Sequence, residues 1–356
     1  MNSQPQPNQP PFTPPTPKRE KRGGVSSAVW ALIGVALGFL LPVFACGGLM
    51  MIAAISASFG PSKEFGSLPQ RRPVAEHVRG PISGPAVAII PVNGPIMEGK
   101  VSPWASETVA SADEIIPMIT EAKHDDSVKA IVLEVNSPGG SVVASDRIYH
   151  ALKDMDKPIV VMMGELAASG GYYISMAGKY IIANPNTLTG SIGVISTFPN
   201  ASGLMDKLGI QMTVVKSGKE KDFGSPYREM TPEERAYWQK VIDETYDSFV
   251  EIVAQNRHMP KSKVLKLADG RVYTGKDALK LGLIDALGYE DDAIAKAADL
   301  GGITDVPRVI RYKAAVSPLE ALLGSAGQRF GLPTFGLSTF PWNQALAPSL
   351  QYRWLP

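Results

Sequence analysis

Residues 158–178 read PIVVMMGELAASGGYYISMAG, and they predict a strand, a corner and a helix in succession. Ile159–Met163 has the length and β-branched content of a buried strand, and the run breaks at Gly164. Ser169 then stands between two alanines and two glycines. A serine at such a corner is placed as a nucleophile, because small neighbours admit a substrate backbone and the helix N-terminus offers free N–H groups. The alternative is a serine that only caps a helix.

Strands and helices alternate along the rest of the chain, which predicts an α/β protein with a parallel sheet and βαβ crossovers. The predicted strands are Ala86–Val92, Val128–Val135, Ile159–Met163, Tyr180–Ala183 and Met212–Lys216. The predicted helices are Ser111–Lys123, Ser141–Lys153, Ser169–Gly178 and Thr231–Gln255, with helical pieces at Lys261–Leu267, Gly275–Leu281 and Asp291–Leu300.

Composition excludes several classes of function. The chain of 356 residues has a formal net charge of +1, which does not suggest nucleic-acid binding. One cysteine, Cys46, cannot form an intrachain disulfide framework. The four histidines are scattered and have no ligand spacing, so we expect neither a metal site nor a cofactor.

The N-terminal part of the chain predicts a membrane anchor. Residues 1–24 form a proline-rich tail that ends in a basic cluster, and we expect them to be disordered and cytoplasmic. Residues 25–59 carry no charge and exceed the length of about 20 apolar residues that a spanning helix needs. Pro42 and the Gly47-Gly48 pair leave a kink or a re-entrant hairpin open, and removal as a signal peptide is a further alternative. Cys46 is then a membrane-embedded thiol.

Three further regions follow the anchor. Residues 60–85 are rich in proline, glycine and arginine and predict a linker. Residues 86–300 carry the alternating pattern and form the expected catalytic domain. Residues 301–356 are a C-terminal extension whose apolar end could pack on the domain, touch the membrane or bind a partner.

Two loops carry residues that suit acyl chemistry. The predicted strand Val128–Val135 is followed by Asn136-Ser137-Pro138-Gly139-Gly140, whose glycine N–H groups could hold a developing oxyanion or could simply make a tight turn. Residues 216–224 read KSGKEKDFG and contain three lysines. A lysine of lowered pKa can act as a general base, although a solvated basic surface is the ordinary reading. Physical chemistry alone does not single out one of the three lysines.

Several segments, in order, resemble the signal peptide peptidase A type of serine peptidase in family S49. They are SPGG, AASGGYYI around Ser169, TLTGSIGV at 187–194, SGKEKDFGSPYREMT at 217–231 and ADGRVYTGKDALKLGLID at 268–285. The resemblance covers about residues 86–300 and implies a crotonase/ClpP-like fold. It implies a Ser/Lys dyad and, because each motif occurs once, the short form of the family.

The resemblance assigns roles residue by residue. It makes Ser169 the nucleophile and Lys221 the general base, with Gly140 and Gly170 as oxyanion-hole donors. Ser191 matches a serine that orients the lysine, whereas Lys216 and Lys219 fall outside the motif.

The resemblance also implies partners and a location. Short-form members assemble into rings, commonly octamers, in which neighbouring protomers supply the serine and the lysine of one site. Their substrates are remnant signal peptides and other hydrophobic peptides at the membrane. Together with the basic cluster, this implies a single-pass protein of the bacterial inner membrane with its catalytic domain on the periplasmic or extracytoplasmic side.

Two other functions fit parts of the sequence. A crotonase-type enzyme would use the same fold on acyl-CoA thioesters, but CoA is cytoplasmic and the anchor places the domain outside. A non-catalytic membrane scaffold on a peptidase fold would not need Ser169 and Lys221, both of which are present.

Overall fold

The computed structural model describes residues 72–99, 108–314 and 351–353. The predicted tail 1–24, the membrane segment 25–59 and Cys46 lie outside these ranges. Within the described ranges, no helix combines the length and the hydropathy needed to cross a bilayer. The predicted anchor therefore stays a prediction.

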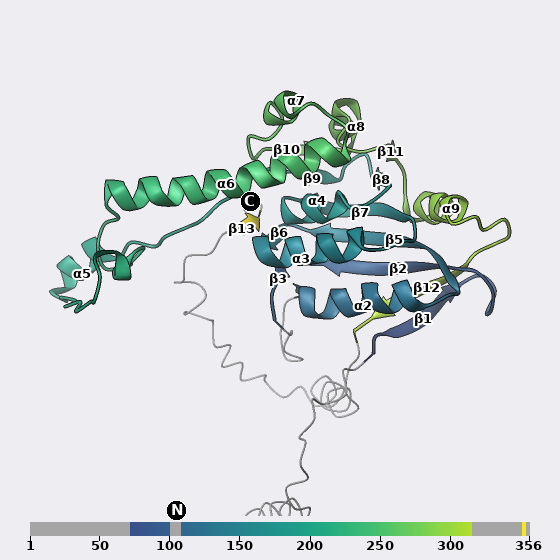
Figure 1. Ribbon diagram of the computed structural model, residues 1–356, viewed down its shortest axis with the longest axis horizontal. Helices are drawn as coiled ribbons and strands as arrows, with labels where there is room; N and C mark the ends of the chain where they lie inside the picture. The colour runs from purple at the N-terminus through teal and green to yellow at the C-terminus, as the bar shows by residue number, and fades with distance from the viewer. Residues whose placement is uncertain (1–71, 100–107, 315–350, 354–356) are drawn as a thin grey trace, which may run out of the picture. The chain divides into compact units, whose positions relative to one another are not determined.

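The core of the fold is a sheet whose central strands run parallel (Figure 1). β2 (Ala86–Asn93) pairs with β5 (Val128–Ser137), which pairs with β7 (Ile159–Ala168). The sheet continues through β12 (Arg308–Lys313) on one side and through β8 (Tyr180–Ala183) and β11 (Ala286–Leu287) on the other. β1 (Val74–Arg79) and the pair β9 (Leu188–Gly190) and β10 (Val272–Thr274) add antiparallel contacts. The predicted α/β class is confirmed, with a mixed rather than a purely parallel sheet.

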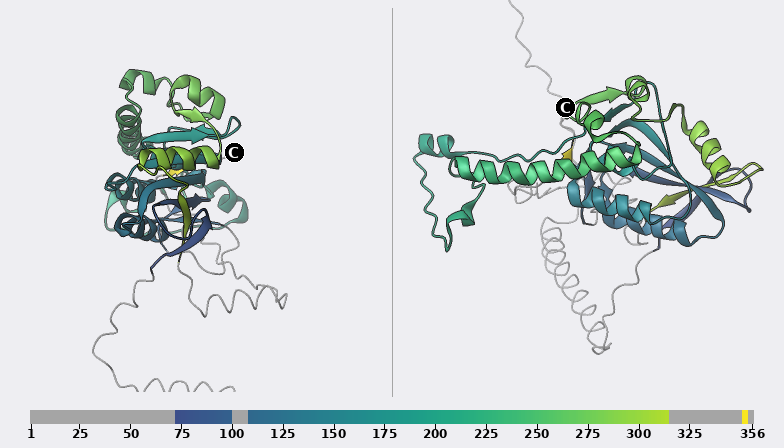
Figure 2. Two further views of the ribbon diagram at one scale, coloured as in Figure 1. Left: turned by 90° about the vertical axis from the view of Figure 1, so that its right-hand side faces the viewer. Right: turned by 45° about the horizontal axis from the view of Figure 1, so that its top comes forward.

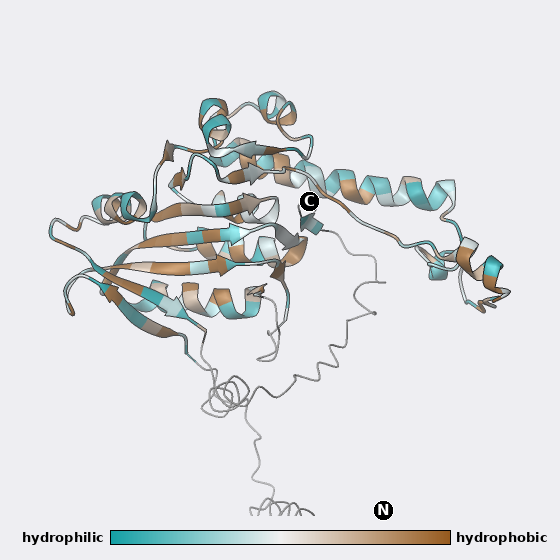
Figure 3. Ribbon diagram, turned by 180° about the vertical axis from the view of Figure 1, so that it is seen from behind, coloured by the Kyte–Doolittle hydropathy of each residue, from teal (hydrophilic) through white to brown (hydrophobic). Residues whose placement is uncertain are grey.

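Helices cover both faces of this sheet, and β2 shows how the sequence makes two cores. Its residues Ala88 and Ile90 belong to the larger core, while Val87 and Ile89 between them belong to the smaller one. The larger core is covered by α2 (Ala112–His124), α3 (Val142–Lys153) and α4 (Gly170–Ser175), and the smaller one by α9 (Glu290–Leu300). Each fully buried aliphatic side chain contributes about 1.5–3 kcal/mol. Figure 3 shows the hydrophobic residues following these central strands.

A second, smaller sheet and a long helix complete the described part of the chain. The small sheet has the order β13-β6-β3-β4, and Figure 2 shows the long helix α6 from two sides. The remaining elements are β3 (Ile96–Met97), β4 (Ala110–Ser111), β6 (Gly139–Ser141), β13 (Gln351–Arg353), α5 (Ser202–Leu208), η1 (Lys219–Asp222), α6 (Pro232–Asn256), α7 (Lys261–Leu265) and α8 (Gly275–Leu281).

The strand before Ser169 is longer than predicted. Pairing jumps from Val135–Met163 to Ser137–Ala167, so β7 bulges beyond Gly164 instead of ending there. The Asn136 side chain accepts a hydrogen bond from the Leu166 N–H at 3.1 Å, which satisfies the bulged backbone. The helix after the corner is correspondingly shorter than predicted, from Gly170 to Ser175.

The predicted strand Met212–Lys216 is wrong. Within the described ranges these residues have no sheet partner, and Val215 is 95% exposed. Their β-branched content suits a strand, but a strand needs a neighbour to supply its hydrogen bonds. In addition, β1 lies within the predicted linker and β12 within the predicted C-terminal extension, so the described sheet reaches beyond residues 86–300 on both sides.

Replacing Tyr172 by phenylalanine should destabilise the fold. Tyr172 of α4 is fully buried, and its hydroxyl donates a hydrogen bond to the Leu283 carbonyl oxygen at 2.8 Å. We expect the free energy of unfolding in urea to fall by about 1–2 kcal/mol, because the carbonyl loses that donor. Tyr237→Phe, at a 64% exposed position, should change it by less than about 0.5 kcal/mol. Equal effects of the two substitutions would contradict the buried bond.

Candidate active site

Ser169 occupies a strained corner between β7 and α4. Its φ of 54° and ψ of −114° suit glycine and cost a residue with a side chain about 1–3 kcal/mol. The Ser169 N–H donates to the Gly190 carbonyl oxygen at 2.8 Å, and its carbonyl oxygen accepts from the Tyr173 N–H at 2.8 Å. These two bonds hold the corner, so the conformation is imposed by β9 on one side and by α4 on the other.

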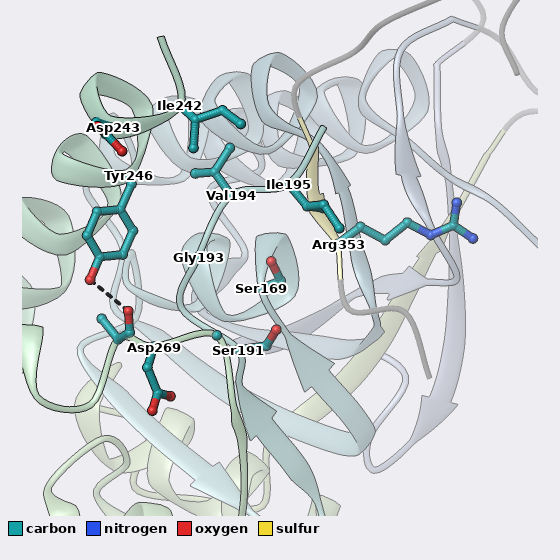
Figure 4. A pocket seen from close by; sticks show the side chains of 12 residues that line it. Ser169, Ser191, Gly193, Val194, Ile195, Ile242, Asp243, Tyr246, Asp269 and Arg353 are labelled. Atoms are coloured by element: carbon teal, nitrogen blue, oxygen red, sulfur yellow. Dashed lines mark hydrogen bonds between the residues drawn. The ribbon is translucent and has the colours of Figure 1, made fainter. Parts of the chain in front are cut away.

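Ser191 stands beside Ser169 because β7 and β9 run parallel. Ala168 pairs with Gly190, so the two serines are the next residues on adjacent strands. The Thr189 hydroxyl donates to the Ala167 carbonyl oxygen at 2.7 Å and fastens this pairing. Both serines line a cavity of about 410 Å³ (Figure 4). Among the residues that the structure describes, neither serine hydroxyl has a hydrogen-bond partner.

The glycine loop after β5 packs against the start of α4. Gly139 has a φ of 86°, and a side chain there would clash with the Gly170 nitrogen and with the Tyr352 carbonyl oxygen. Gly140 lies between Ile96 of β3 and Tyr352 of β13. The first N–H groups of a helix have no partner within it, which suits Gly170 as an oxyanion donor. The glycine loop therefore lies beside Ser169 and the start of α4, as the family resemblance implies. The roles of Gly140 and Gly170 as oxyanion-hole donors stay predictions.

The opposite wall of the cavity comes from residues that the sequence did not single out. Tyr246 of α6 and Asp269 lie across from the serines. The Tyr246 hydroxyl donates to the Ala268 carbonyl oxygen at 2.7 Å, and burial raises the pKa of Tyr246. Arg271 hydrogen-bonds Asp269 and lowers the pKa of its carboxyl. A protonated tyrosine and a paired carboxylate are poor general bases.

The structure does not bring Lys221 to Ser169 within one chain. Lys221 is exposed in η1, and the described residues that line the cavity include no lysine or histidine. Its loop is tied to the start of α6, where Arg228 joins Asp222 to Glu234. The cavity meets α6 at Ile242, Asp243 and Tyr246. These residues lie 8 to 12 positions beyond Glu234 and thus about 12–18 Å from it along the helix axis.

The ion pairs that fix this loop are strong at neutral pH. Hydrogen bonds from Arg228 hold the pKa of Glu234 at about 2 and hold the pKa of Asp222 well below its ordinary value. Both carboxylates are therefore ionised and paired with Arg228. The loop that carries Lys221 is thus fixed to the start of α6. Within the described ranges, no three His, Cys, Asp or Glu side chains are grouped to hold a metal ion.

A serine at a strained strand-to-helix corner, facing a glycine loop, is an arrangement typical of serine hydrolases on α/β folds. The model of peptidase family S49 matches residues 151–304, and that of Clp protease matches residues 99–189. Both matched ranges contain Ser169 and Gly170. The fold is accordingly Clp protease-like, as the resemblance implied.

Individual relatives agree with these family matches. A protein of Enterococcus faecium, named provisionally as a signal peptide peptidase SppA, is 35% identical over 298 residues, which are 80% of this chain and 84% of that protein. A protein of Methanocaldococcus jannaschii, named provisionally as a protease, is 45% identical over 55% of this chain and 64% of its own length. A chloroplastic serine protease SPPA of Arabidopsis thaliana is 36% identical over 61% of this chain and 32% of its own length. The chain therefore belongs to peptidase family S49 and is a serine peptidase of the SppA type.

The strain at Ser169 predicts the order of stability of two inactive variants. Ser169→Gly removes the side chain that disfavours a positive φ, whereas Ser169→Ala keeps it. We expect Ser169→Gly to be more stable than Ser169→Ala by about 1 kcal/mol in urea unfolding, net of the extra chain entropy of glycine. A less stable glycine variant would contradict a strained corner.

Proposed function

We propose that the protein is an endopeptidase that uses Ser169 and Lys221 as a dyad. The observation that carries this proposal is the corner at Ser169, which presents the hydroxyl to a cavity beside the N-terminus of α4. The Lys221 amine takes the proton of Ser169 Oγ, which attacks a peptide carbonyl carbon. The N–H groups of Gly140 and Gly170 stabilise the resulting oxyanion.

The second half of the reaction regenerates the serine. The Lys221 ammonium gives its proton to the leaving amine as the peptide C–N bond breaks, which leaves an acyl ester on Ser169. Lys221 then takes a proton from a water molecule, whose hydroxide attacks the ester carbonyl carbon. The Lys221 ammonium returns this proton to Ser169 Oγ as the ester C–O bond breaks and the peptide carboxylic acid leaves. Ser191, at the side of Ser169, is proposed to accept a hydrogen bond from the lysine and to orient it.

A neighbouring copy of the chain is proposed to supply Lys221. Two observations support this. The Lys221 loop is tied to the start of α6, whereas the cavity that holds Ser169 meets that helix 8 to 12 residues further along. The segment beside the loop also exposes apolar residues that a second copy would cover. Those residues are Leu204, Leu208, Ile210, Met212, Val214 and Val215. A head-to-tail contact of this kind repeats around a closed ring, and an octamer is the expected form.

Hydrophobic peptides are the proposed substrates, including signal peptides left in the membrane after cleavage. The apolar cavity residues Val194, Ile195 and Ile242 suit such chains, and the E. faecium relative carries the name of a signal peptide peptidase. Anchoring through residues 25–59 would hold the site at the bilayer, on the extracytoplasmic side of a bacterial inner membrane.

Mixing two inactive variants tests the shared site. Ser169→Ala and Lys221→Ala, each alone, should cleave a fluorogenic hydrophobic peptide at background rate. Co-expressed with different tags and purified as mixed oligomers, they should recover about a quarter of wild-type activity, because one site in four would combine an intact serine with a neighbour's intact lysine.

The matched control is Lys219→Ala, which changes a lysine of the same loop and should keep most of the activity in the uniform oligomer. Mixed oligomers without activity would place serine and lysine in one chain. Equal losses in Lys219→Ala and Lys221→Ala would mean that the loop acts through its charge. Full activity of uniform Ser169→Ala would remove Ser169 from the mechanism, whereas an inactive wild type would leave the scaffold reading.

A further inference from the structure

The residue directly after Lys221 is an acid, Asp222, and its position is unfavourable for a lysine base. The Asp222 side chain is only 13% exposed, so water screens its charge poorly. A carboxylate beside a lysine stabilises the ammonium form, and an ammonium cannot take the proton of a serine hydroxyl. The proposed dyad therefore requires that Asp222 be kept from pairing with Lys221.

Arg228 binds this carboxylate with two of its nitrogens. Arg228 Nε donates to Asp222 Oδ2 at 3.0 Å, and Nη2 donates to Oδ1 at 3.0 Å. The same Nη2 reaches the Asp222 carbonyl oxygen at 3.1 Å, so the backbone of η1 is held as well. Lys216 adds a second cation to the carboxylate. Both carboxylate oxygens are therefore engaged, and within the described ranges Lys221 forms no ion pair.

The start of α6 fixes Arg228 from the other side. Glu234 is 2% exposed and accepts from Arg228 Nη1 at 2.8 Å. Glu234 also accepts from the Thr231 N–H at 2.9 Å, as the capping box of α6 requires. Arg228 and Lys216 thus balance the charges of Asp222 and Glu234. Loss of Arg228 would leave this group with a net negative charge next to Lys221.

The other carboxylates of the same segment are more exposed. Glu220, on the other side of Lys221 in the chain, is 57% exposed and pairs with the 81% exposed Lys219 at 3.5 Å. Glu229 and Glu233 are exposed too. Water and salt screen such charges, so they bias the lysine less than Asp222 would.

In the proposed shared site, the cavity of a neighbouring copy also faces Lys221. Its titratable or charged lining residues, besides the serines, are Asp243, Tyr246, Asp269 and Arg353. Asp269 is bonded by Arg271, and Asp243 accepts from Gln239 at 2.8 Å. None of these groups contacts Arg228 within one chain, so an effect that follows from replacing Arg228 and depends on Asp222 does not come from them.

We propose that Arg228 is a positioning residue for the base: it holds the Asp222 carboxylate away from Lys221 and leaves the lysine able to accept the serine proton. This inference rests on the proposed Ser169/Lys221 dyad and adds a residue that does not itself touch the substrate. A clamp that only joined η1 to α6 would steady the loop, but it would not set the pH at which the lysine works.

The pH dependence of Arg228→Gln tests this role. Cleavage of a fluorogenic hydrophobic peptide by the full-length protein gives kcat/KM from pH 6 to pH 10. The acid limb of the Arg228→Gln profile should move to higher pH by about one unit, because Asp222 then stabilises the ammonium. Near pH 7 kcat/KM should fall about tenfold, mainly through kcat, and most of the loss should be recovered at alkaline pH.

Removal of the carboxylate should rescue the variant. In Arg228→Gln/Asp222→Asn the acid limb should return to within about half a unit of the wild type, because no anion is left to hold the lysine protonated. Asp222→Asn alone should not raise the limb. If Arg228 were only a clamp, the second substitution would remove further bonds and lower activity again, and that result would overturn the proposal.

Two further variants keep the test decisive. Arg235→Gln makes the same chemical change at an exposed position of α6 and should leave the profile unchanged. Lys216→Gln leaves the two-nitrogen contact of Arg228 in place, so it should shift the limb in the same direction but less far, even if Arg228→Gln fails to fold. An unshifted limb in the folded Arg228→Gln and Lys216→Gln variants would overturn the proposal.

A reading without turnover separates this inference from the proposed function. In the Ser169→Ala background, acetic anhydride acylates Lys221 only in its uncharged form, and mass spectrometry gives the rate. Adding Arg228→Gln should slow this acylation about tenfold near pH 7. Slower acylation together with a wild type that cleaves no peptide would contradict the dyad alone. Equal acylation, with Lys221 still essential for cleavage, would contradict the role of Arg228 alone.

Discussion

The hydrogen bond from the Ser169 N–H to the Gly190 carbonyl oxygen is the contact on which the site depends. It extends the parallel pairing of β7 and β9 by one residue and holds Ser169 at a positive φ. The hydroxyl is then turned into the cavity instead of along the strand. The same pairing places Ser191 at its side, so one register fixes two of the predicted site residues. Strain at the corner is offset by the buried sheet around it.

Sequence patterns predicted the structure correctly where the local pattern and the tertiary contacts favour the same element. Continuous apolar runs identified β2, β5 and β7, and small residues marked the corner at Ser169. Prediction from sequence failed where residues far away in the chain decide whether a segment forms a strand. Gly164 reads as a strand end, but the Asn136 side chain satisfies the bulge and β7 continues. Met212–Lys216 reads as a strand, but no strand in the part of the chain that the structure describes pairs with it.

The two parts of the proposed active site differ in the same way. The residues proposed around the serine lie together within one chain, because β9 pairs with β7 and the glycine loop of β6 packs against α4. The Lys221 loop is held by Arg228 and Glu234 at the start of α6, away from these elements. No periodicity could have predicted the strand Gln351–Arg353, since three residues become a strand only because β6 and Ile195 supply neighbours on both sides.

Covalent labelling tests the central claim that Ser169 is the nucleophile most directly. The full-length protein would be treated with an alkyl fluorophosphonate, digested and analysed by mass spectrometry. The phosphonyl group should be found on the peptide that contains Ser169, and Lys221→Ala should slow the labelling strongly, because the serine loses the base that activates it. Labelling of another residue, or labelling of Ser169 at the same rate without Lys221, would contradict the dyad.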